Sequence, residues 1–208
     1  MNENKRKVAL VSPTDDHTKE VIQRAIDDDV AQFECFYGDD ASAMAVECVR
    51  SGGADLLMKG AVNTDVLLRA ALDKEHGILQ PGRVMTHISV ANIPGWQRPL
   101  IFSDAAVIPH PDILQMDAIV RYTVEAARNL GIATPKVALT NFTEKENPKF
   151  PQTAVYQEIR CRAAEGLYGD VVIGGPMDVK TALDSESGTI KGIDSPVVGN
   201  ADILIFPN

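Results

Sequence analysis

Between residues 7 and 73, short apolar runs alternate with helical patterns, and this rhythm constrains the fold more than any other feature of the sequence. Runs rich in β-branched residues predict strands at residues 7–12, 31–37 and 54–59. The segments that follow them predict three helices. The first begins at the start signal Ser12-Pro13-Thr14, and the other two cover residues 41–50 and 64–73. Neighbouring parallel strands need a crossover connection, which a helix supplies. We therefore expect an α/β fold in which helices cover both faces of a parallel sheet.

Further along, the pattern changes and predicts a mixed sheet. Residues 83–93 and 99–103 are expected to form strands joined by a turn at 94–98, as in a hairpin or meander. Asp112 is expected to cap a long helix over 113–130. The rhythm then resumes and predicts a helix at 153–165 and strands at 136–141, 170–174 and 201–206.

Three later segments are expected to stand apart from this rhythm. The polar stretch 142–152 is expected to be a long loop and a candidate lid. Residues 182–198 contain much Ser, Gly and Asp and are expected to form an exposed excursion without a strand. The strand at 201–206 is apolar enough to be buried on both faces, although nothing after it in the sequence can cover it.

Composition and charge argue against several classes of function. With a net charge of −9 and a pI near 4.9, the chain is not expected to bind nucleic acid, which requires clustered Lys and Arg. The N-terminal segment 1–7 is polar and has no apolar signal region, and no window has the length and apolar content of a membrane span. We therefore expect a cytoplasmic protein with no nucleic-acid or membrane partner.

The cysteines and histidines give no sign of a disulfide or a metal site. Cys35, Cys48 and Cys161 are an odd number without CxxC spacing, as expected for unpaired core thiols in a reducing cytoplasm. The remaining candidate ligands lack the spacing of a metal site; they are His17, His76 and His110.

The segment 56–72 is the best candidate for an anion site. Its strand ends at Lys59-Gly60, and a helix starts after the turn at Asn63-Thr64. Unpaired N–H groups and the positive end of the helix dipole favour an anion at such a helix N-terminus. Lys59 and Arg69 would add full positive charges. Two alternatives stay open, namely that these cations only reach solvent and that Asn63 and Thr64 only cap the helix.

Seven phrases in order along the chain resemble the phosphate acetyl/butyryl transferase family, and more closely its butyryl branch: LMKG, RVMTH, SDAA, PKVAL, GGPMD, KGI and GNADILIFP. Together they span the chain from about Lys7 to Asn208. The resemblance implies a three-layer α/β/α architecture like that of the isocitrate and isopropylmalate dehydrogenases, with a mixed sheet and two subdomains that flank a cleft. We expect the subdomains to comprise residues 1–110 and 111–208.

The same resemblance implies a phosphate acyltransferase, which transfers a short or branched acyl group reversibly between coenzyme A and phosphate. Acyl-CoA and phosphate then give acyl phosphate and CoA, with coenzyme A as a substrate, no permanently bound cofactor and no metal. A homodimer is also implied. Because the reaction passes through a negatively charged tetrahedral species, we expect cations and backbone N–H groups to hold the phosphate.

Residue chemistry and the resemblance together give a set of candidate substrate-binding residues: Lys59, Gly60, Thr64, Arg69, Arg83, Thr86 and Asp104. Thr86 can donate to a phosphate oxygen, and His87 can exchange a proton near neutral pH. If both lie on one strand, they point to opposite faces, so we expect Thr86 to contact the ligand. For His87 a structural role is favoured, with a ligand contact as the alternative. Asp104 is expected either to orient a basic group or bind a hydrogen-bond donor, or else to cap the turn that follows it.

Two residues of the glycine-rich GGPMD phrase and one apolar residue complete the set of candidate positions. Gly175 and Asp178, in the GGPMD phrase, are possible contacts because glycine lets a coenzyme approach the backbone, although ordinary turn chemistry explains them equally well. Ile108 stands where related sequences tend to carry Asn, so a polar contact is expected to be missing.

The family's reaction centre usually contains a Ser-Arg pair and an acidic residue, which we do not find in this chain. The catalytic residues are therefore not predicted, the C-terminal part of the family fold is expected to be absent, and we expect weak or no turnover from a chain that ends at Asn208. A non-catalytic regulatory domain that binds phosphate or coenzyme A is the main alternative. A decarboxylating dehydrogenase is disfavoured because the sequence has no Gly-rich dinucleotide fingerprint and no clustered metal-binding aspartates.

Overall fold

The computed structural model describes residues 5–96 and 98–207 of the chain. Residues 1–4 of the polar N-terminal segment, Gln97 of the expected turn, and the last residue, Asn208, lie outside the described residues. The chain divides into two compact units, the first ending at Arg83 and the second beginning at Val84. This division lies earlier than the expected boundary at residue 110, because residues 84–110 carry two strands that pair within the second unit's sheet.

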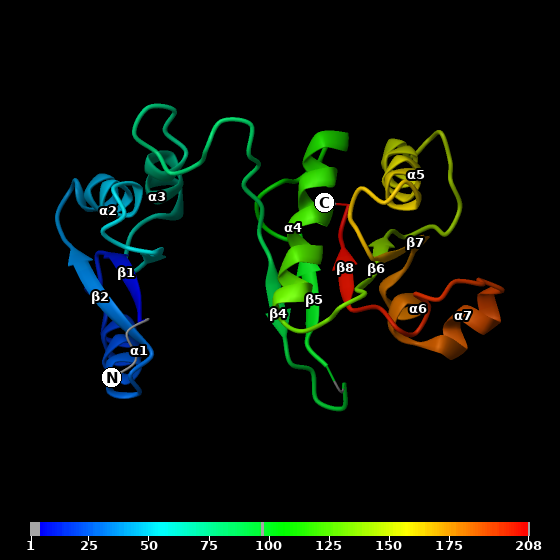
Figure 1. The fold of residues 1–208 in the computed structure, drawn as a ribbon, viewed down its shortest axis with the longest axis horizontal. Helices are drawn as coiled ribbons and strands as arrows, with labels where there is room; N and C mark the ends of the chain where they lie inside the picture. Colours follow the sequence, from blue (N-terminus) through cyan, green and yellow to red (C-terminus); the bar gives the residue numbers. More distant parts are fainter. Residues whose placement is uncertain (1–4, 97, 208) are drawn as a thin grey trace. The chain divides into compact units, whose positions relative to one another are not determined.

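The first unit alternates strands and helices, as the rhythm of its sequence predicts (Figure 1). In chain order its elements are β1 (Arg6–Val11), α1 (Asp16–Asp27), β2 (Ala31–Phe36), α2 (Ala41–Arg50), β3 (Leu56–Lys59) and α3 (Thr64–Ala71). The strands form a parallel sheet in the order β2-β1-β3. Its parallel pairing confirms the prediction made from the crossover rule.

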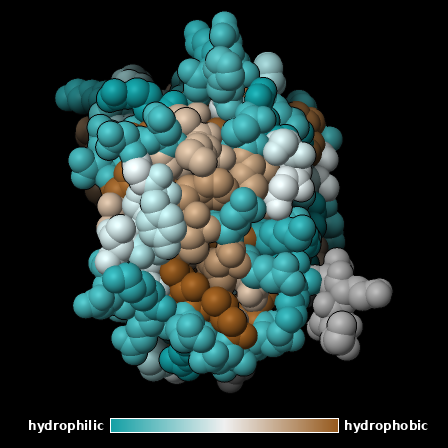
Figure 2. Space-filling model, turned by 90° about the vertical axis from the view of Figure 1, so that its left-hand side faces the viewer, coloured by the Kyte–Doolittle hydropathy of each residue, from teal (hydrophilic) through white to brown (hydrophobic). Residues whose placement is uncertain are grey.

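The core of the first unit lies on both faces of β1. Ala9 and Val11 pack in a cluster with Ala45 of α2 and Leu67 of α3. Side chains alternate along a strand, so Val8 and Leu10 point to the opposite face, where they are also buried. The surface of this unit is not uniformly hydrophilic. Figure 2 shows apolar side chains gathered between hydrophilic ones on the side that faces the viewer.

The second unit contains the mixed sheet that the middle of the sequence predicts. Its elements are β4 (Ser89–Ala91), β5 (Leu100–Ser103), α4 (Ile113–Asn129), β6 (Lys136–Thr140), α5 (Pro151–Ala164), β7 (Val172–Met177), α6 (Val179–Leu183), α7 (Ser185–Lys191) and β8 (Ile203–Ile205). The strand order is β4-β5-β8-β6-β7. Only the pairing of β4 with β5 is antiparallel among the described strand pairs of this sheet.

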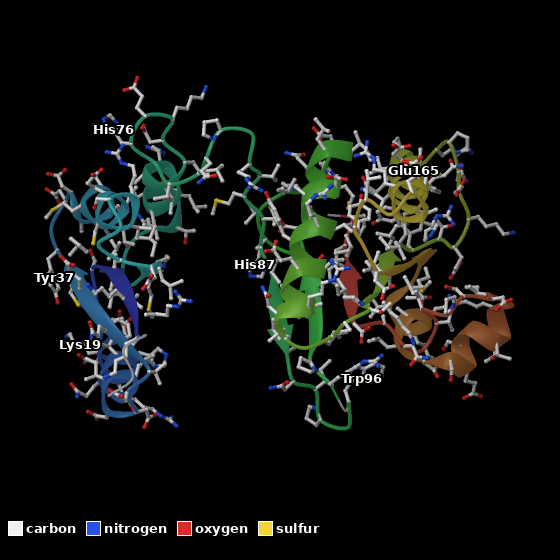
Figure 3. The ribbon with its side chains drawn as sticks, in the orientation of Figure 1. Lys19, Tyr37, His76, His87, Trp96 and Glu165 are labelled. Atoms are coloured by element: carbon white, nitrogen blue, oxygen red, sulfur yellow. The ribbon has the colours of Figure 1, made fainter. Side chains whose placement is uncertain are left out.

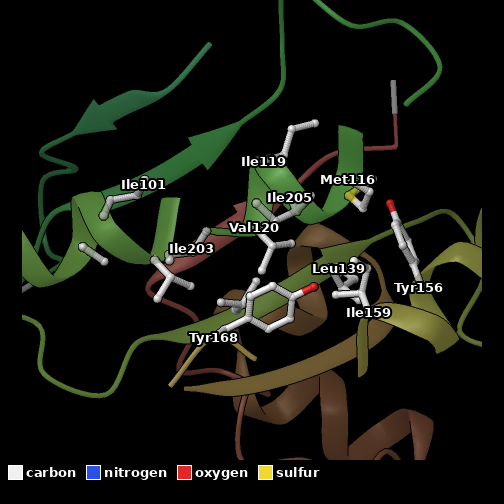
Figure 4. Close-up of a cluster of buried hydrophobic side chains, with 13 residues drawn as sticks. Ile101, Met116, Ile119, Val120, Leu139, Tyr156, Ile159, Tyr168, Ile203 and Ile205 are labelled. Atoms are coloured by element: carbon white, nitrogen blue, oxygen red, sulfur yellow. The ribbon is translucent and has the colours of Figure 1, made fainter. Parts of the chain in front are cut away.

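The last strand, β8, lies in the middle of this sheet and is buried on both faces. Ile203 and Ile205 pack with α4 and α5 in the larger hydrophobic cluster, which Figure 4 shows. Leu204 points the other way and packs with Ala182 of α6 and Val197. The burial expected for residues 201–206 is therefore supplied by helices that precede the strand in the sequence. Helices on both faces make this unit a three-layer α/β/α structure.

Two sequence predictions about this unit are wrong. The strand expected at 83–93 is limited to Ser89–Ala91, because Thr86 and the backbone of His87 are bonded to a buried carboxylate instead of a neighbouring strand. The stretch 182–198 has no strand, as expected, but it is not simply an exposed excursion, because it contains the end of α6 and all of α7, and Val197 is buried. Each of these short helices has a capping aspartate directly before it, which satisfies N–H groups of the first turn.

The helix starts were predicted with mixed success. Asp112 caps α4 in a complete capping box: its carboxylate accepts from Gln115 N–H at 2.8 Å, and its own N–H donates to the Gln115 side chain at 3.0 Å. The helix start predicted at Ser12-Pro13-Thr14 is wrong, because α1 begins at Asp16 with Asp15 as its N-cap. None of the described helices combines the length and the apolar content needed to cross a membrane.

An ion pair between Arg98 and Asp202 ties the segment before β5 to the start of β8. Arg98 Nε lies 2.6 Å from Asp202 Oδ1, and the Asp202 residue is 3% exposed. Asp202 Oδ2 also accepts from Lys136 N–H at 2.8 Å. The pair therefore joins β5, β8 and β6 at the amino ends of the strands.

We expect Arg98→Met to lower the free energy of unfolding by about 2 kcal/mol. Breaking a buried ion pair typically costs 3–5 kcal/mol, and this value is reduced here because the Arg98 side chain is 38% exposed. Urea denaturation measures the loss. The double variant Arg98→Met/Asp202→Asn should recover part of it because no charge is then left buried. A loss below about 0.5 kcal/mol, as for a surface pair, would contradict the expectation.

Candidate functional site

In the first unit, the carboxyl ends of β1 and β3 meet in a tight double turn. Gly60 N–H donates to Val11 O and Ala61 N–H donates to Ser12 O, both at 2.8 Å. A Cβ atom at Gly60 would lie 2.5 Å from Val11 O and 2.7 Å from Ser12 O, so only glycine fits. The predicted site residue Gly60 therefore shapes this corner through close packing, and its own N–H group is already bonded.

The N-terminus of α3 presents unpaired N–H groups at the same edge of the sheet. Asn63 is the N-cap residue, but its side chain makes no capping hydrogen bond. Its backbone carbonyl accepts from Val66 and Leu67. The first N–H groups of a helix lack partners inside the helix, and those of Thr64 and Asp65 donate to no acceptor among residues 5–96 and 98–207, so they can bind an anion.

Two cations accompany this helix start. Lys59 is exposed at the end of β3, with Nζ 3.4 Å from Gly60 O. Arg69 has an 83% exposed side chain, and its Nη2 lies 3.8 Å from Asp65 Oδ2 in the first turn of the helix. Arg69 thus leans toward the helix N-terminus, as long helical side chains do. Arg83 is also exposed, and its guanidinium makes no ion pair or hydrogen bond among residues 5–96 and 98–207.

In the second unit, Asp104 organises the carboxyl end of β5. The residue is 2% exposed and accepts four hydrogen bonds. The Ala106 and Val107 N–H groups donate to Oδ1 at 2.8 Å each. The Thr86 hydroxyl donates to Oδ2 at 2.8 Å, and His87 N–H donates to the same oxygen at 3.2 Å. Asp104 therefore joins the segment before β4 to the turn after β5.

This arrangement keeps Asp104 ionised. Burial raises the pKa of its carboxyl, but the hydrogen bonds from Ala106, Val107, Thr86 and His87 outweigh burial and leave the pKa below its ordinary value. A carboxylate can only accept, so the single hydroxyl hydrogen of Thr86 points to Asp104.

The oxygen of Thr86 is then an acceptor toward any further partner. Its contact with Ser103 Oγ, at 3.3 Å, consequently has Ser103 as the donor. For Thr86 to donate to a phosphate oxygen, its bond to Asp104 would have to break.

His87 is held in place by its backbone and lies on the segment that leads into β4 (Figure 3). Its ring Nε2 lies 3.4 Å from Ser89 Oγ, and Nδ1 is buried without a hydrogen-bond partner in the described part of the chain. The premise that Thr86 and His87 share a strand is wrong, because neither residue belongs to β4.

Gly175 and Asp178 lie at the carboxyl end of β7. A Cβ atom at Gly175, whose φ is 122°, would lie 2.5 Å from Leu139 O. Asp178 caps α6 through Thr181 N–H at 2.6 Å and pairs with Lys191 at 2.5 Å. The bond from Lys191, followed by that from Thr181, lowers the pKa of Asp178 to about 2. Two strands separate β7 from β5, so these residues share an edge with Asp104 but lie about 14 Å from it.

Comparison with known proteins shows which protein family has this sequence pattern and fold. A family model described as phosphate acetyl/butaryl transferase matches residues 4–208. The chain belongs to this family. A phosphate acetyltransferase of Thermotoga maritima is 32% identical to it over 98% of the chain and 77% of that protein. A phosphate butyryltransferase of Clostridium acetobutylicum is 37% identical over 81% of the chain and 56% of that protein.

Solved structures agree with the fold of the phosphate acetyl/butyryl transferases. A branched-chain phosphotransacylase from Enterococcus faecalis superposes with a TM-score of 0.81 at 23% identity, over 98% of this chain and 79% of the other. A phosphotransacetylase from Streptococcus pyogenes gives a TM-score of 0.80 at 20% identity. The chain thus spans little more than half of one curated family member and about four-fifths of a solved one.

Two polar residues at the carboxyl ends of strands β5 and β6 were not predicted from the sequence as site residues. Ser103 is fully buried and lies in the hydrogen-bond chain that ends at Asp104. Asn141 follows β6 directly, is buried, and donates its backbone N–H to Met177 O at 2.8 Å. In both cases the available signal was a polar residue at the end of an apolar run, where parallel sheets collect ligand contacts.

No group of three or more His, Cys, Asp and Glu side chains is arranged to hold a metal ion in residues 5–96 and 98–207. Among the predicted site residues, the cations that could pair with an anionic ligand are Lys59, Arg69 and Arg83.

Proposed function

We propose that this protein is a phosphate acyltransferase that moves a short or branched acyl group reversibly between coenzyme A and phosphate. The observation that carries the proposal is the family match over residues 4–208, together with relatives named phosphate acetyltransferase and phosphate butyryltransferase. In the forward direction a phosphate oxygen attacks the thioester carbonyl carbon. The carbon–sulfur bond then breaks, and the coenzyme leaves as a thiol.

The first unit supports this proposal with a site suited to phosphate. The open N–H groups of Thr64 and Asp65 can donate to phosphate oxygens, and the helix dipole adds a partial positive charge. Lys59 and Arg69 bring mobile full charges to the same edge, where they can neutralise the attacking phosphate and the charge that develops on the carbonyl oxygen. Gly60 keeps the corner compact enough for these groups to act together.

The second unit supports the proposal with a hydrogen-bond acceptor of fixed orientation, the hydroxyl oxygen of Thr86. Because Thr86 gives its hydrogen to Asp104, its oxygen can receive a hydrogen bond from a protonated phosphate oxygen or from the thiol of coenzyme A. We assign Asp104 a positioning role, since it is buried and its oxygens are occupied. The proposal also includes Arg83 as a substrate-binding residue, and Gly175, Asp178 and His87 as further candidate contacts.

The proposal includes three further features of the family resemblance. Coenzyme A acts as a substrate and not as a permanently bound cofactor. The protein works in the cytoplasm, which fits three cysteines that are all free thiols; these are Cys35, Cys48 and Cys161. It assembles as a homodimer.

Replacement of Arg69 by alanine should weaken the binding of phosphate or coenzyme A by about tenfold, because a charge-assisted hydrogen bond is lost while the exposed helix face keeps its packing. Isothermal titration calorimetry measures both ligands. Arg24→Ala is the matched control, since Arg24 is equally exposed on α1 and pairs with Asp28 at 3.6 Å in the same i,i+4 geometry.

Each outcome of this titration is informative. Unchanged affinity in Arg69→Ala would remove Arg69 from the site. Failure of the unaltered protein to bind either phosphate or coenzyme A would remove the proposed function itself. Binding of both without acyl transfer would favour a regulatory domain instead of an enzyme.

A further inference from the structure

A cavity of about 560 Å³ lies between α2 and α3 within the first unit. Its lining includes four small or branched apolar residues, two from each helix: Ala43, Val46, Val66 and Ala70. The volume lies in the range of pockets that bind small molecules, and such pockets are lined mainly by apolar groups with a few polar ones. The groove is therefore large enough and apolar enough to hold an organic ligand.

Carboxylates stand at both ends of this apolar floor. Asp39 and Asp40 precede α2 at one end, and Glu47 and Asp73 lie near the far ends of the two helices. Asp40 and Glu47 are two helical turns apart, or about 10 Å along the axis. A ligand that satisfies both ends needs two positive charges separated by an apolar body of that length.

Negative charge predominates in the groove even when neighbouring cations are counted. Arg50 pairs with Glu47 at 2.6 Å through one carboxylate oxygen, which leaves the other oxygen available. Asp73 Oδ1 accepts from the Glu75 and His76 N–H groups, which leaves Oδ2 available. Arg69 lines the groove, but its guanidinium is directed to Asp65, which is not among the lining residues.

A buried hydroxyl provides an independent sign of a ligand. Ser42 lines the cavity and is only 5% exposed, and its hydroxyl has no hydrogen-bond partner among residues 5–96 and 98–207. Buried polar groups normally find partners, and a ligand N–H group would supply one here.

We propose that the groove between α2 and α3 binds a linear organic dication, in which two ammonium groups are joined by a methylene chain about as long as two helical turns. The ammonium groups pair with Asp39 and Asp40 at one end and with Glu47 and Asp73 at the other. The methylene chain packs on the apolar floor. This ligand class is opposite in charge to phosphate and coenzyme A, so the groove is a second site and does not depend on the proposed acyl transfer.

Calorimetric titration of the full chain with 1,8-diaminooctane tests this directly. We expect it to bind at least about tenfold more tightly than 1-aminooctane, which has the same apolar body and one charge. Magnesium chloride, a dication without an apolar body, should give no saturable binding in this groove. Equal affinity for the diamine and the monoamine, or no binding of the diamine, would overturn the proposal.

Matched variants locate the binding. Asp40→Asn and Glu47→Gln should each weaken diamine binding about tenfold. Asn is also a good N-cap residue, and Asp40 makes no side-chain capping bond, so the helix start should be preserved. Ala43→Trp fills the groove from an exposed position and should abolish binding. Glu20→Gln removes an exposed charge from α1 and should change nothing.

If Glu20→Gln weakens binding as much as Asp40→Asn, the attraction is unspecific and the groove is not the site. If Ala43→Trp binds the diamine normally while its circular dichroism spectrum matches that of the unaltered protein, the proposal is also overturned. The diamine titration uses no variant of Arg69, and the phosphate titration uses no variant of the groove carboxylates, so this site and the proposed function can fail separately.

Discussion

Replacement of Asp104 by alanine is expected to lower the free energy of unfolding by about 4 kcal/mol. The carboxylate is buried and accepts four hydrogen bonds, three of them from backbone N–H groups that would lose their acceptor. Hydrogen bonds to charged groups contribute about 1.5–3 kcal/mol each, and part of this is offset because the buried charge is also removed. Urea denaturation followed by circular dichroism measures the loss.

Two comparisons sharpen this result. Asp65→Ala removes an exposed carboxylate whose nearest cation is 3.8 Å away, and it should cost less than about 0.5 kcal/mol. Asp104→Asn should fall between the two, because the amide keeps one acceptor oxygen but turns an NH2 group toward the donors. A loss below about 1 kcal/mol in Asp104→Ala would mean that the four hydrogen bonds do not hold the two segments together.

The effect of Asp104 should also depend on pH in a defined direction. Its pKa is lowered in the folded protein, so its contribution is present above the ordinary carboxyl value of 3.8 and is lost as the pH falls through the folded value. The difference in stability between the unaltered protein and Asp104→Asn should therefore narrow in acid. A difference that grows on acidification would contradict this assignment.

Replacement of Gly60 by alanine is expected to destabilise the first unit by about 3 kcal/mol and to abolish measurable phosphate binding. The new methyl group would lie 2.5 Å from Val11 O and 2.7 Å from Ser12 O, and these are backbone atoms that cannot move aside without separating the ends of β1 and β3. Separation of these ends would displace Lys59 and the start of α3 together. Urea denaturation and phosphate titration measure the two effects.

Gly38→Ala is the matched control for Gly60→Ala. Gly38 has a φ of 89° but open space around it, so its replacement tests backbone strain without a clash and should cost about 1 kcal/mol. Phosphate binding should survive this change. If Gly60→Ala behaves like Gly38→Ala in both measurements, close packing does not shape the corner.

Local patterns were sufficient for most of the fold. The helix at Ala41–Arg50 begins and ends where the sequence predicts, because its stop signal Ser-Gly-Gly is local. The capping box at Asp112 is equally local. The wrong predictions have two causes: a long-range contact that local patterns do not reveal, and a composition signal that was given too much weight. Strand β4 is short because Asp104, far along the chain, takes the hydrogen bonds of Thr86 and His87. The stretch 182–198 was judged by its Ser, Gly and Asp content, although Asp184 caps helix α7.

The candidate site was predictable in part for the same reason. The strand-to-helix corner at Lys59 and Thr64 follows from local signals, and the structure places both residues there. The commitment of the Gly60 N–H group to Val11 could not be foreseen, since it depends on the register of β1 against β3. For Asp104, the sequence left three alternatives, namely to orient a basic group, to bind a donor or to cap the turn, and the carboxylate both caps the turn and accepts from the Thr86 hydroxyl.

Acyl transfer itself provides the most direct test of the proposed function. The protein, expressed from its complete reading frame, is mixed with butyryl-CoA, and release of free thiol is followed when phosphate is added. We predict phosphate-dependent thiol release with an equal amount of butyryl phosphate, and a large reduction in Gly60→Ala. The absence of phosphate-dependent release with acetyl-CoA, butyryl-CoA and isobutyryl-CoA alike would contradict the proposed function.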